Sequence, residues 1–219
     1  MSVIHPRELG YEDGVFLVKI ARRAIELYLT TQRVFEPPSD TPEKLMKNGM
    51  AFVTIEKLIG ERKELRGCIG FLEPRTPLIE TVIKAAISAA TEDPRFEAMT
   101  IDELENSVLE VSVLSPYIEV KDPLNEVEIG RHGIYIVYGV LNRGVLLPQV
   151  PVDYCWDTET FLAEGCLKAG LAPDAWMSER TKIYVFEAMI FMETKPKGEV
   201  IVRDLRKEYE EKCGLGPKT

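Results

Sequence analysis

The stretch MAFVTIEKLIGERKELRGCIGFL, residues 50–72, decides the fold of this chain. Two runs rich in apolar and β-branched residues, 50–59 and 63–72, flank a short polar turn that contains Gly60. Runs of this length on either side of a glycine turn predict a β-hairpin. The hexapeptide Leu-Arg-Gly-Cys-Ile-Gly, residues 65–70, therefore lies on the second arm of the hairpin.

The hexapeptide is also the first candidate for a functional site. Side chains alternate along a strand, so Arg66 and Cys68 are expected side by side on one face. A nearby guanidinium favours the thiolate form of a cysteine, which makes the thiol reactive. Gly67 and Gly70 have no side chain, so a ligand or another backbone could approach closely. The alternative is structural: unpaired cysteines are commonly buried, and glycine in a strand often marks a bulge.

Helical and strand patterns follow one another along the rest of the chain. Apolar residues recur with helical spacing in two long segments and in one shorter segment near residue 160. The predicted helices are 13–30, 76–91 and 158–169, and the predicted strands outside the hairpin are 107–114, 117–120, 133–140, 145–150 and 183–193. Strands that arrive in hairpins, with helices between the groups, indicate an α+β fold with a largely antiparallel sheet.

The pattern of hairpin, Arg-Gly pair and helix occurs twice, at Arg66-Gly67 and again at Arg143-Gly144. Its two copies differ in loop length and in most residues, so the duplication signal is weak. We expect a single domain over residues 10–203, with room for a larger and a smaller lobe around a cleft. Residues 204–219 are expected to form a charged terminal helix and a frayed tail.

The hexapeptide and several later segments resemble the AMMECR domain family, named after a human chromosomal region linked to Alport syndrome and elliptocytosis. The matching segments keep the family order and are Asp93-Pro94-Arg95-Phe96, Glu110–Ser115, Gly130-Arg131-His132-Gly133, Leu146–Val150, Trp156-Asp157, Phe161-Leu162 and Lys168–Leu171. The resemblance implies two related β/α repeats around one curved, barrel-like sheet. It implies little about activity, although such proteins accompany Memo-family and radical-SAM proteins, and a role in RNA modification has been suggested.

Composition limits the classes of partner. The formal net charge is −9 and the sequence pI is about 5.0, which argues against generic nucleic-acid binding. Glutamate outnumbers aspartate 27 to 9, and only two glutamines and four asparagines occur, a bias typical of thermophile proteins. No segment resembles a signal peptide or a membrane span, so we expect a cytoplasmic protein.

The four cysteines are expected to be free thiols. They stand at positions 68, 155, 166 and 213, without a Cys-x-x-Cys pair or a zinc-site spacing. Disulfides are rare in the cytosol. With His5 and His132 as the only imidazoles, we expect neither a metal nor another cofactor.

Three further residues are candidates for ligand binding. Gln149 follows Pro148 and is expected where strand 145–150 breaks at a sheet margin, as a ligand contact or as a cap of the broken strand. His132 lies in a predicted tight turn and is expected to be exposed. Arg95 is expected to bind Asp93 in a structural ion pair or to contribute to the site.

Three functions remain open on these residues. In the first, a cleft around Arg66, Gly67 and Gly70 binds a small anionic ligand or a partner protein. In the second, the chain is an enzyme that uses Cys68 as a nucleophile or redox thiol. In the third, it acts on RNA, which the acidity and the lack of a stacking aromatic array disfavour. We favour the first and expect Cys68 and Gln149 to face one cavity; the oligomeric state is open.

Overall fold

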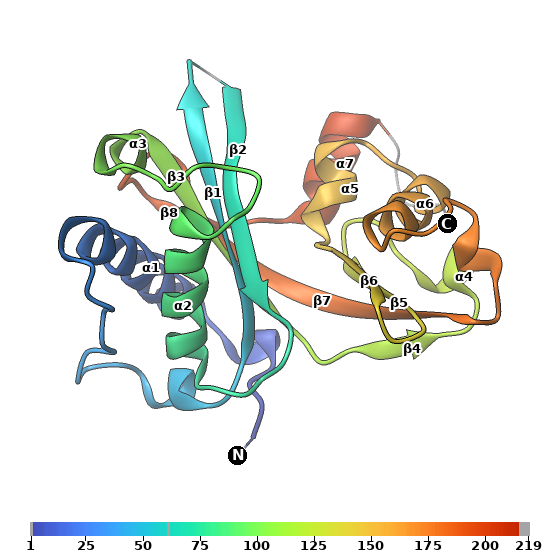
Figure 1. The fold of residues 1–219 in the computed structure, drawn as a ribbon, viewed down its shortest axis with the longest axis horizontal. Helices are drawn as coiled ribbons and strands as arrows, with labels where there is room; N and C mark the ends of the chain where they lie inside the picture. Colours follow the sequence, from blue (N-terminus) through green and yellow to red (C-terminus); the bar gives the residue numbers. More distant parts are fainter. Residues whose placement is uncertain (1, 61, 215–219) are drawn as a thin grey trace. The chain divides into compact units, whose positions relative to one another are not determined.

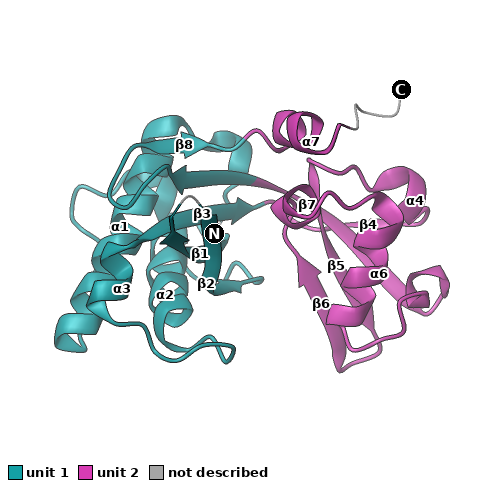
Figure 2. Ribbon diagram, turned by 90° about the horizontal axis from the view of Figure 1, so that it is seen from above, with its two compact units in different colours: residues 1–114, 189–203 teal, residues 115–188, 204–219 magenta. Residues whose placement is uncertain are grey.

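The computed structural model describes residues 2–60 and 62–214, and the chain forms two compact units (Figures 1 and 2). Unit 1 consists of Met1–Leu114 and Met189–Arg203, and unit 2 consists of Ser115–Ala188 and Asp204–Thr219. Strand β7, Thr181–Glu193, contributes its first part to unit 2 and its last residues to unit 1.

Unit 1 combines an antiparallel sheet with two long helices. Its elements are η1 (Pro6–Glu8), α1 (Tyr11–Thr31), η2 (Glu43–Met46), β1 (Met50–Ile59), β2 (Arg62–Phe71), α2 (Leu78–Thr91), α3 (Ile101–Glu105), β3 (Ser107–Leu114), the end of β7, and β8 (Val200–Val202). The strand order is β2-β1-β3-β7, and β8 also pairs with β7. Helices α1 and α2 pack against each other and against this sheet (Figure 1).

The core of unit 1 follows from strand alternation. Ala51, Val53 and Ile55 of β1 are fully buried, whereas the residues between them are half-buried. Helix α2 brings an alanine-rich side to the same core. The sheet therefore has one apolar face under the helices and a second face, turned away from α1 and α2, that carries polar side chains.

Unit 2 repeats the same plan on a smaller scale. Its elements are β4 (Ile118–Val120), α4 (Pro123–Glu126), β5 (His132–Tyr138), β6 (Asn142–Leu146), α5 (Gln149–Asp153), α6 (Thr158–Lys168), η3 (Ala175–Met177), the first part of β7, and α7 (Leu205–Cys213). Strands β4 and β5 pair with β7, and β6 pairs with β5. The apolar core of unit 2 lies between these strands and α6.

The two Arg-Gly pairs occupy equivalent places in the two units. In unit 1, hairpin β1–β2 is followed by α2 and then by β3, which pairs with β1. In unit 2, hairpin β5–β6 is followed by α6 and then by β7, which pairs with β5. A Cβ atom on Gly67 would lie 2.0 Å from the Ala89 carbonyl oxygen of α2, and one on Gly144 would lie 2.6 Å from the Gly165 carbonyl oxygen of α6. Both glycines allow a helix to pack directly on a strand.

The predicted α+β class with a curved, antiparallel sheet and two related β/α repeats is confirmed. Most predicted elements lie within a few residues of their observed bounds. The predicted terminal helix corresponds to α7, while residues 215–219 of the predicted frayed tail lie outside the described residues. The single domain over 10–203 stays a prediction.

Candidate functional site

Strand β2 does not keep the regular alternation that the sequence predicts. Ile55 of β1 lies opposite Gly67, but the next residue, Glu56, lies opposite Leu65. Arg66 is thus the additional residue of a β-bulge, which changes the direction of its side chain. The regular alternation on which the side-by-side placement of Arg66 and Cys68 was based is therefore interrupted, and that placement stays a prediction.

Arg66 is engaged in an ion pair on its own side of β2. Its Nε and Nη2 donate to the two Glu103 carboxylate oxygens at 3.0 and 3.1 Å, and Nη2 donates to the Glu97 carbonyl at 2.8 Å. The guanidinium lies over the Phe96 ring, and the side chain is only 11% exposed. Arg66 holds the pKa of Glu103 down at about 2. These contacts tie β2 to α3, a structural role that leaves little of the guanidinium accessible.

Cys68 is held from two sides. Its side chain is half-buried, and its Sγ accepts a hydrogen bond from Thr54 Oγ1 at 3.3 Å. Its backbone N–H donates to Asp93 Oδ2 at 2.8 Å. Asp93 thereby occupies the outer edge of β2, where an open edge would invite pairing with another strand. The thiol itself remains partly accessible to solvent.

Arg95 is the cation beside Cys68. Its Nε and Nη2 donate to the Asp93 carboxylate at 2.9 and 2.7 Å, so the predicted ion pair of Asp93 and Arg95 is present. The carboxylate is buried, but the Arg95 side chain is 50% exposed. Arg95 also interacts electrostatically with Cys68 and lies over the Phe96 ring. Of the two arginines predicted for the site, Arg95 rather than Arg66 is accessible next to the thiol.

We expect the Asp93 carboxylate to make folding stability fall in acid. Its bond to Arg95 lowers the pKa of Asp93 from 3.8 to about 2. A carboxyl whose pKa is lower in the folded chain stabilises it above the unfolded pKa, and that contribution disappears as the pH falls through the folded value. Urea unfolding should therefore show about 2 kcal/mol lost between pH 4 and pH 2. Asp93→Asn should flatten this dependence. The exposed control Glu73→Gln should leave it unchanged, and an equal flattening by both variants would contradict the assignment.

Cys68 belongs to a row of side chains across three strands. Thr54 of β1 lies opposite Cys68 of β2 on one side and opposite Glu110 of β3 on the other. Glu110 is buried and forms an ion pair with Arg203 at 3.0 Å. We call these four residues the Cys68 row. It places a thiol, a hydroxyl, a carboxylate and a guanidinium on the sheet face turned away from α1 and α2.

Gly67 and Gly70 each have a packing reason. Gly67 is covered by the carbonyl of Ala89, as described above. A Cβ atom on Gly70 would lie 2.2 Å from the Phe52 ring of β1, because the two residues lie opposite each other. The close approach predicted for these glycines is real, and the groups that approach are a helix and an aromatic ring.

Gln149 and His132 belong to unit 2, whereas the residues of the Cys68 row belong to unit 1. The strand predicted over 145–150 ends at Leu146, and the buried Gln149 is instead the first residue of α5, because Pro148 cannot continue the ladder. The shared cavity of Cys68 and Gln149 stays a prediction.

His132 was predicted to be exposed in a turn, and this prediction is wrong. The residue is buried at the start of β5. Burial lowers its pKa, and its Nδ1 accepts a hydrogen bond from the Glu128 backbone at 3.2 Å. The imidazole therefore has a structural contact that ties the turn to the strand.

The prediction of four free thiols is wrong. Cys155 and Cys213, which are 58 positions apart in the sequence, form a disulfide. Helix α7 folds back on unit 2 and brings the two cysteines together: Tyr209 donates to the Trp156 carbonyl at 2.9 Å. The expectation rested on the rarity of disulfides in the cytosol, a rule to which hyperthermophiles are an exception. Cys68 and Cys166 are thiols, and Cys166 is fully buried.

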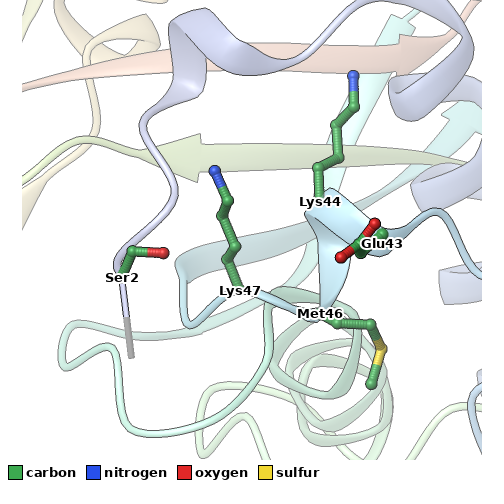
Figure 3. Close-up of a pocket in the computed structure, with 5 residues that line it drawn as sticks. All are labelled: Ser2, Glu43, Lys44, Met46 and Lys47. Carbon is green, nitrogen blue, oxygen red and sulfur yellow. The ribbon is translucent and has the colours of Figure 1, made fainter.

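A pocket of about 550 Å³ lies elsewhere in unit 1 (Figure 3). It is lined by Ser2, Glu43, Lys44, Met46 and Lys47. Lys44 and Lys47 extend away from Met46, but each is bound to a carboxylate, Asp13 at 3.0 Å and Glu8 at 2.6 Å. The pocket shares no lining residue with the Cys68 row. Within residues 2–60 and 62–214, no cluster of three or more His, Cys, Asp or Glu side chains could hold a metal ion.

Sequence reasoning missed Thr54, Glu110 and Arg203 as parts of the candidate site. The sequence carried a signal for two of them. Thr54 and Glu110 are polar residues in strand segments where polar and apolar residues alternate. Arg203 carries no such signal, because it follows the short strand β8 and reaches Glu110 only in the folded unit.

Comparison with known proteins shows to which family the chain belongs. The AMMECR1 family model matches residues 18–191. The chain belongs to the AMMECR1 family. Among its relatives, a protein from Thermofilum pendens is 50% identical over 208 residues, covering 90% of this chain and 97% of the relative. The protein MJ0810 from Methanocaldococcus jannaschii is 49% identical over 204 residues, covering 91% and 99%.

The structure agrees with this assignment. The crystal structure of the uncharacterized protein PH0010 from Pyrococcus horikoshii matches with a TM-score of 0.85 at 46% sequence identity, covering 90% of this chain and 99% of that one. These relatives come from archaeal thermophiles, and their names state no activity. Across the described part of this chain, no helix is both long and apolar enough to cross a membrane.

Proposed function

We propose that unit 1 binds a small ligand with an anionic group at Cys68 and Arg95. The observation that carries this proposal is the half-exposed Arg95 guanidinium beside a half-buried thiol. Arg66, the other cation of the signature, is bound to Glu103 and largely enclosed. An anionic ligand therefore meets Arg95 first, and the exposed edge of that guanidinium can donate charge-assisted hydrogen bonds.

The surroundings of Cys68 suit a ligand with both polar and apolar parts. Thr54 supplies a hydroxyl next to the thiol, and the Phe52 ring covers Gly70 on the same face of the sheet. Binding of a small polar ligand generally uses a few placed polar groups on such a partly apolar surface. A carboxylate-bearing segment of a partner protein would use the same contacts, so the experiment starts from a small anion.

Titration with inorganic phosphate, followed by amide NMR shifts, tests the proposal. We expect saturable shifts at Cys68 and Arg95, and at least about tenfold weaker binding in Arg95→Gln, because a charged hydrogen bond contributes about 1.5–3 kcal/mol. Arg75→Gln is the matched control, since Arg75 is an exposed arginine paired with Glu73. Equal affinity in the two variants, or shifts confined to other residues, would contradict the proposal.

The second candidate function is that of a thiol enzyme with Cys68 as the nucleophile. It is favoured by the hydrogen bond from Thr54 and by the Arg95 cation, both of which stabilise a thiolate. Cys68 should then react with iodoacetamide in the native protein, while the buried Cys166 should not. Arg95→Gln and Thr54→Val should slow the reaction several-fold, and Arg66→Ala should change it little. A rate independent of Arg95 and Thr54 would remove the activated-thiol function.

A further inference from the structure

The sheet of unit 2 has a second face that the function proposed above does not use. Ile134 and Ile136 of β5 are fully buried, and their side chains contact the position of Gly165 on α6. By alternation, Tyr135 and Val137 point to the opposite face, and both are half-buried. That face is therefore turned away from α6.

Three tyrosines come together on this face, and we call them the tyrosine cluster. Tyr135 lies opposite Tyr184 of β7, and their ring centroids are 6.1 Å apart. Tyr117, which precedes β4, lies 5.3 Å from the ring of Tyr135. All three are half-exposed. The cluster cannot be read from the sequence, because its residues are far apart along the chain and meet only through strand pairing.

Two cations lie one step along the same face. Val137 lies opposite Lys182 of β7 and opposite Arg143 of β6. Lys182 and Arg143 are exposed, and in the part of the chain that the structure describes neither forms a hydrogen bond or a salt bridge. Their row is about 7 Å from the tyrosine row, given the strand rise.

One carboxylate also faces this surface. Glu119 lies opposite Tyr184, and Lys121 donates to it at 2.6 Å. That bond, together with the nearby Lys182, lowers the pKa of Glu119. Counting Lys121, Lys182 and Arg143 against Glu119 and Glu126, which also interacts with Lys121, this region keeps a local charge of +1 on a chain whose net charge is −9. It therefore attracts anions although the protein as a whole repels them.

We propose that this face binds a nucleotide unit, with the base on the tyrosine cluster and the phosphate between Arg143 and Lys182. Half-exposed tyrosines on a sheet provide surfaces on which bases stack, and unpaired cations beside them match a phosphate. The unit comes either from a free nucleotide or from a single strand. The inference goes beyond the function proposed for Cys68, because it uses other residues in the other unit. The proposal agrees with the expectation that generic nucleic-acid binding is weak, because three tyrosines can stack with only one or two bases.

The test is an amide NMR titration with adenosine 5′-monophosphate, adenosine, ribose 5-phosphate and the hexanucleotide rA6. We expect the monophosphate to shift Tyr135, Val137 and Tyr184. Adenosine and ribose 5-phosphate should each bind at least about tenfold more weakly, because each lacks one of the two contacts. Tighter binding of rA6 than of the monophosphate, at equal nucleotide concentration, identifies a single strand as the source. Equal binding identifies the free nucleotide.

Tyr135→Leu keeps an apolar side chain but removes the ring, and should weaken binding about tenfold or more. Lys182→Gln, at an exposed position, should weaken binding of the monophosphate and leave adenosine binding unchanged. Tyr154→Leu is the matched control in unit 2, since Tyr154 is 68% exposed and stacks on Trp156. The proposal is overturned if the monophosphate causes no saturable shifts, or if Tyr154→Leu weakens binding as much as Tyr135→Leu. It is also overturned if Lys182→Gln leaves binding of the monophosphate unchanged.

Discussion

Replacing Arg22 by methionine is expected to lower the free energy of unfolding by about 3–5 kcal/mol, because it leaves a buried carboxylate without its cation. Arg22 of α1 and Glu193 of β7 are both buried in unit 1. Arg22 donates to the two Glu193 oxygens at 2.8 and 2.5 Å and to the carbonyls of Leu104 and Ser107 at 3.1 and 2.7 Å. Glu193 also accepts from the Leu109 backbone N–H. One side chain thus joins α1, α3, β3 and β7.

Urea unfolding measures this effect, and Lys19→Met is the control because Lys19 is an exposed cation on the same helix. The control should change stability by no more than about 0.5 kcal/mol. The double variant Arg22→Met/Glu193→Met should recover part of the loss, since no buried charge remains unpaired. A loss below about 1 kcal/mol for Arg22→Met would show that water or another group reaches Glu193 easily.

Removing the Cys155–Cys213 disulfide is expected to lower the free energy of unfolding by about 2–4 kcal/mol. Its cysteines are 58 residues apart, and closing a loop of this length restricts the unfolded chain strongly. Helix α7 keeps other contacts with unit 2, including the bond from Lys212 to the Asp153 carbonyl at 2.5 Å. We therefore expect a less stable but folded protein. Guanidinium unfolding of the chain and of Cys155→Ser/Cys213→Ser provides the measurement.

The reductant dithiothreitol supplies the matched control. It should lower the unfolding midpoint of the natural chain and leave the double serine variant unchanged, because the variant has no disulfide to lose. Mass analysis of the native protein should find two alkylated thiols after unfolding without reductant, Cys68 and Cys166. Four alkylated thiols under those conditions would show that the disulfide does not form.

The helices and strands of this chain could be predicted well from its sequence, since they depend on local patterns. Hairpin β1–β2 follows from two apolar runs around a glycine turn, and α2 from its helical spacing of apolar residues. The repeat of Arg-Gly was visible at both positions, and the structure shows why: each glycine lies under the helix that follows its hairpin. These features need only the order of residues along the chain.

The candidate site was predicted in part. The Asp93–Arg95 ion pair was anticipated and is present, while the roles of Cys68 and Arg95 in a site stay predictions. The ion pair of Arg66 with Glu103 was not predicted, because the bulge at Arg66 depends on the pairing of β2 with β1 and cannot be read from β2 alone. Thr54 and Glu110 join Cys68 for the same reason, as neighbours across strands.

The sequence by itself determined the fold class, the main helices and strands, the paired glycines and the family, because each rests on spacing within a short segment or on an ordered set of motifs. Only the tertiary structure decided which side chains contact one another. Arg203 reaches Glu110, Cys213 reaches Cys155, and the ring of Tyr135 lies near that of Tyr184 only after distant strands and helices have come together. A side chain's partner depends on which strands pair and in which register, and a one-residue bulge is enough to change it.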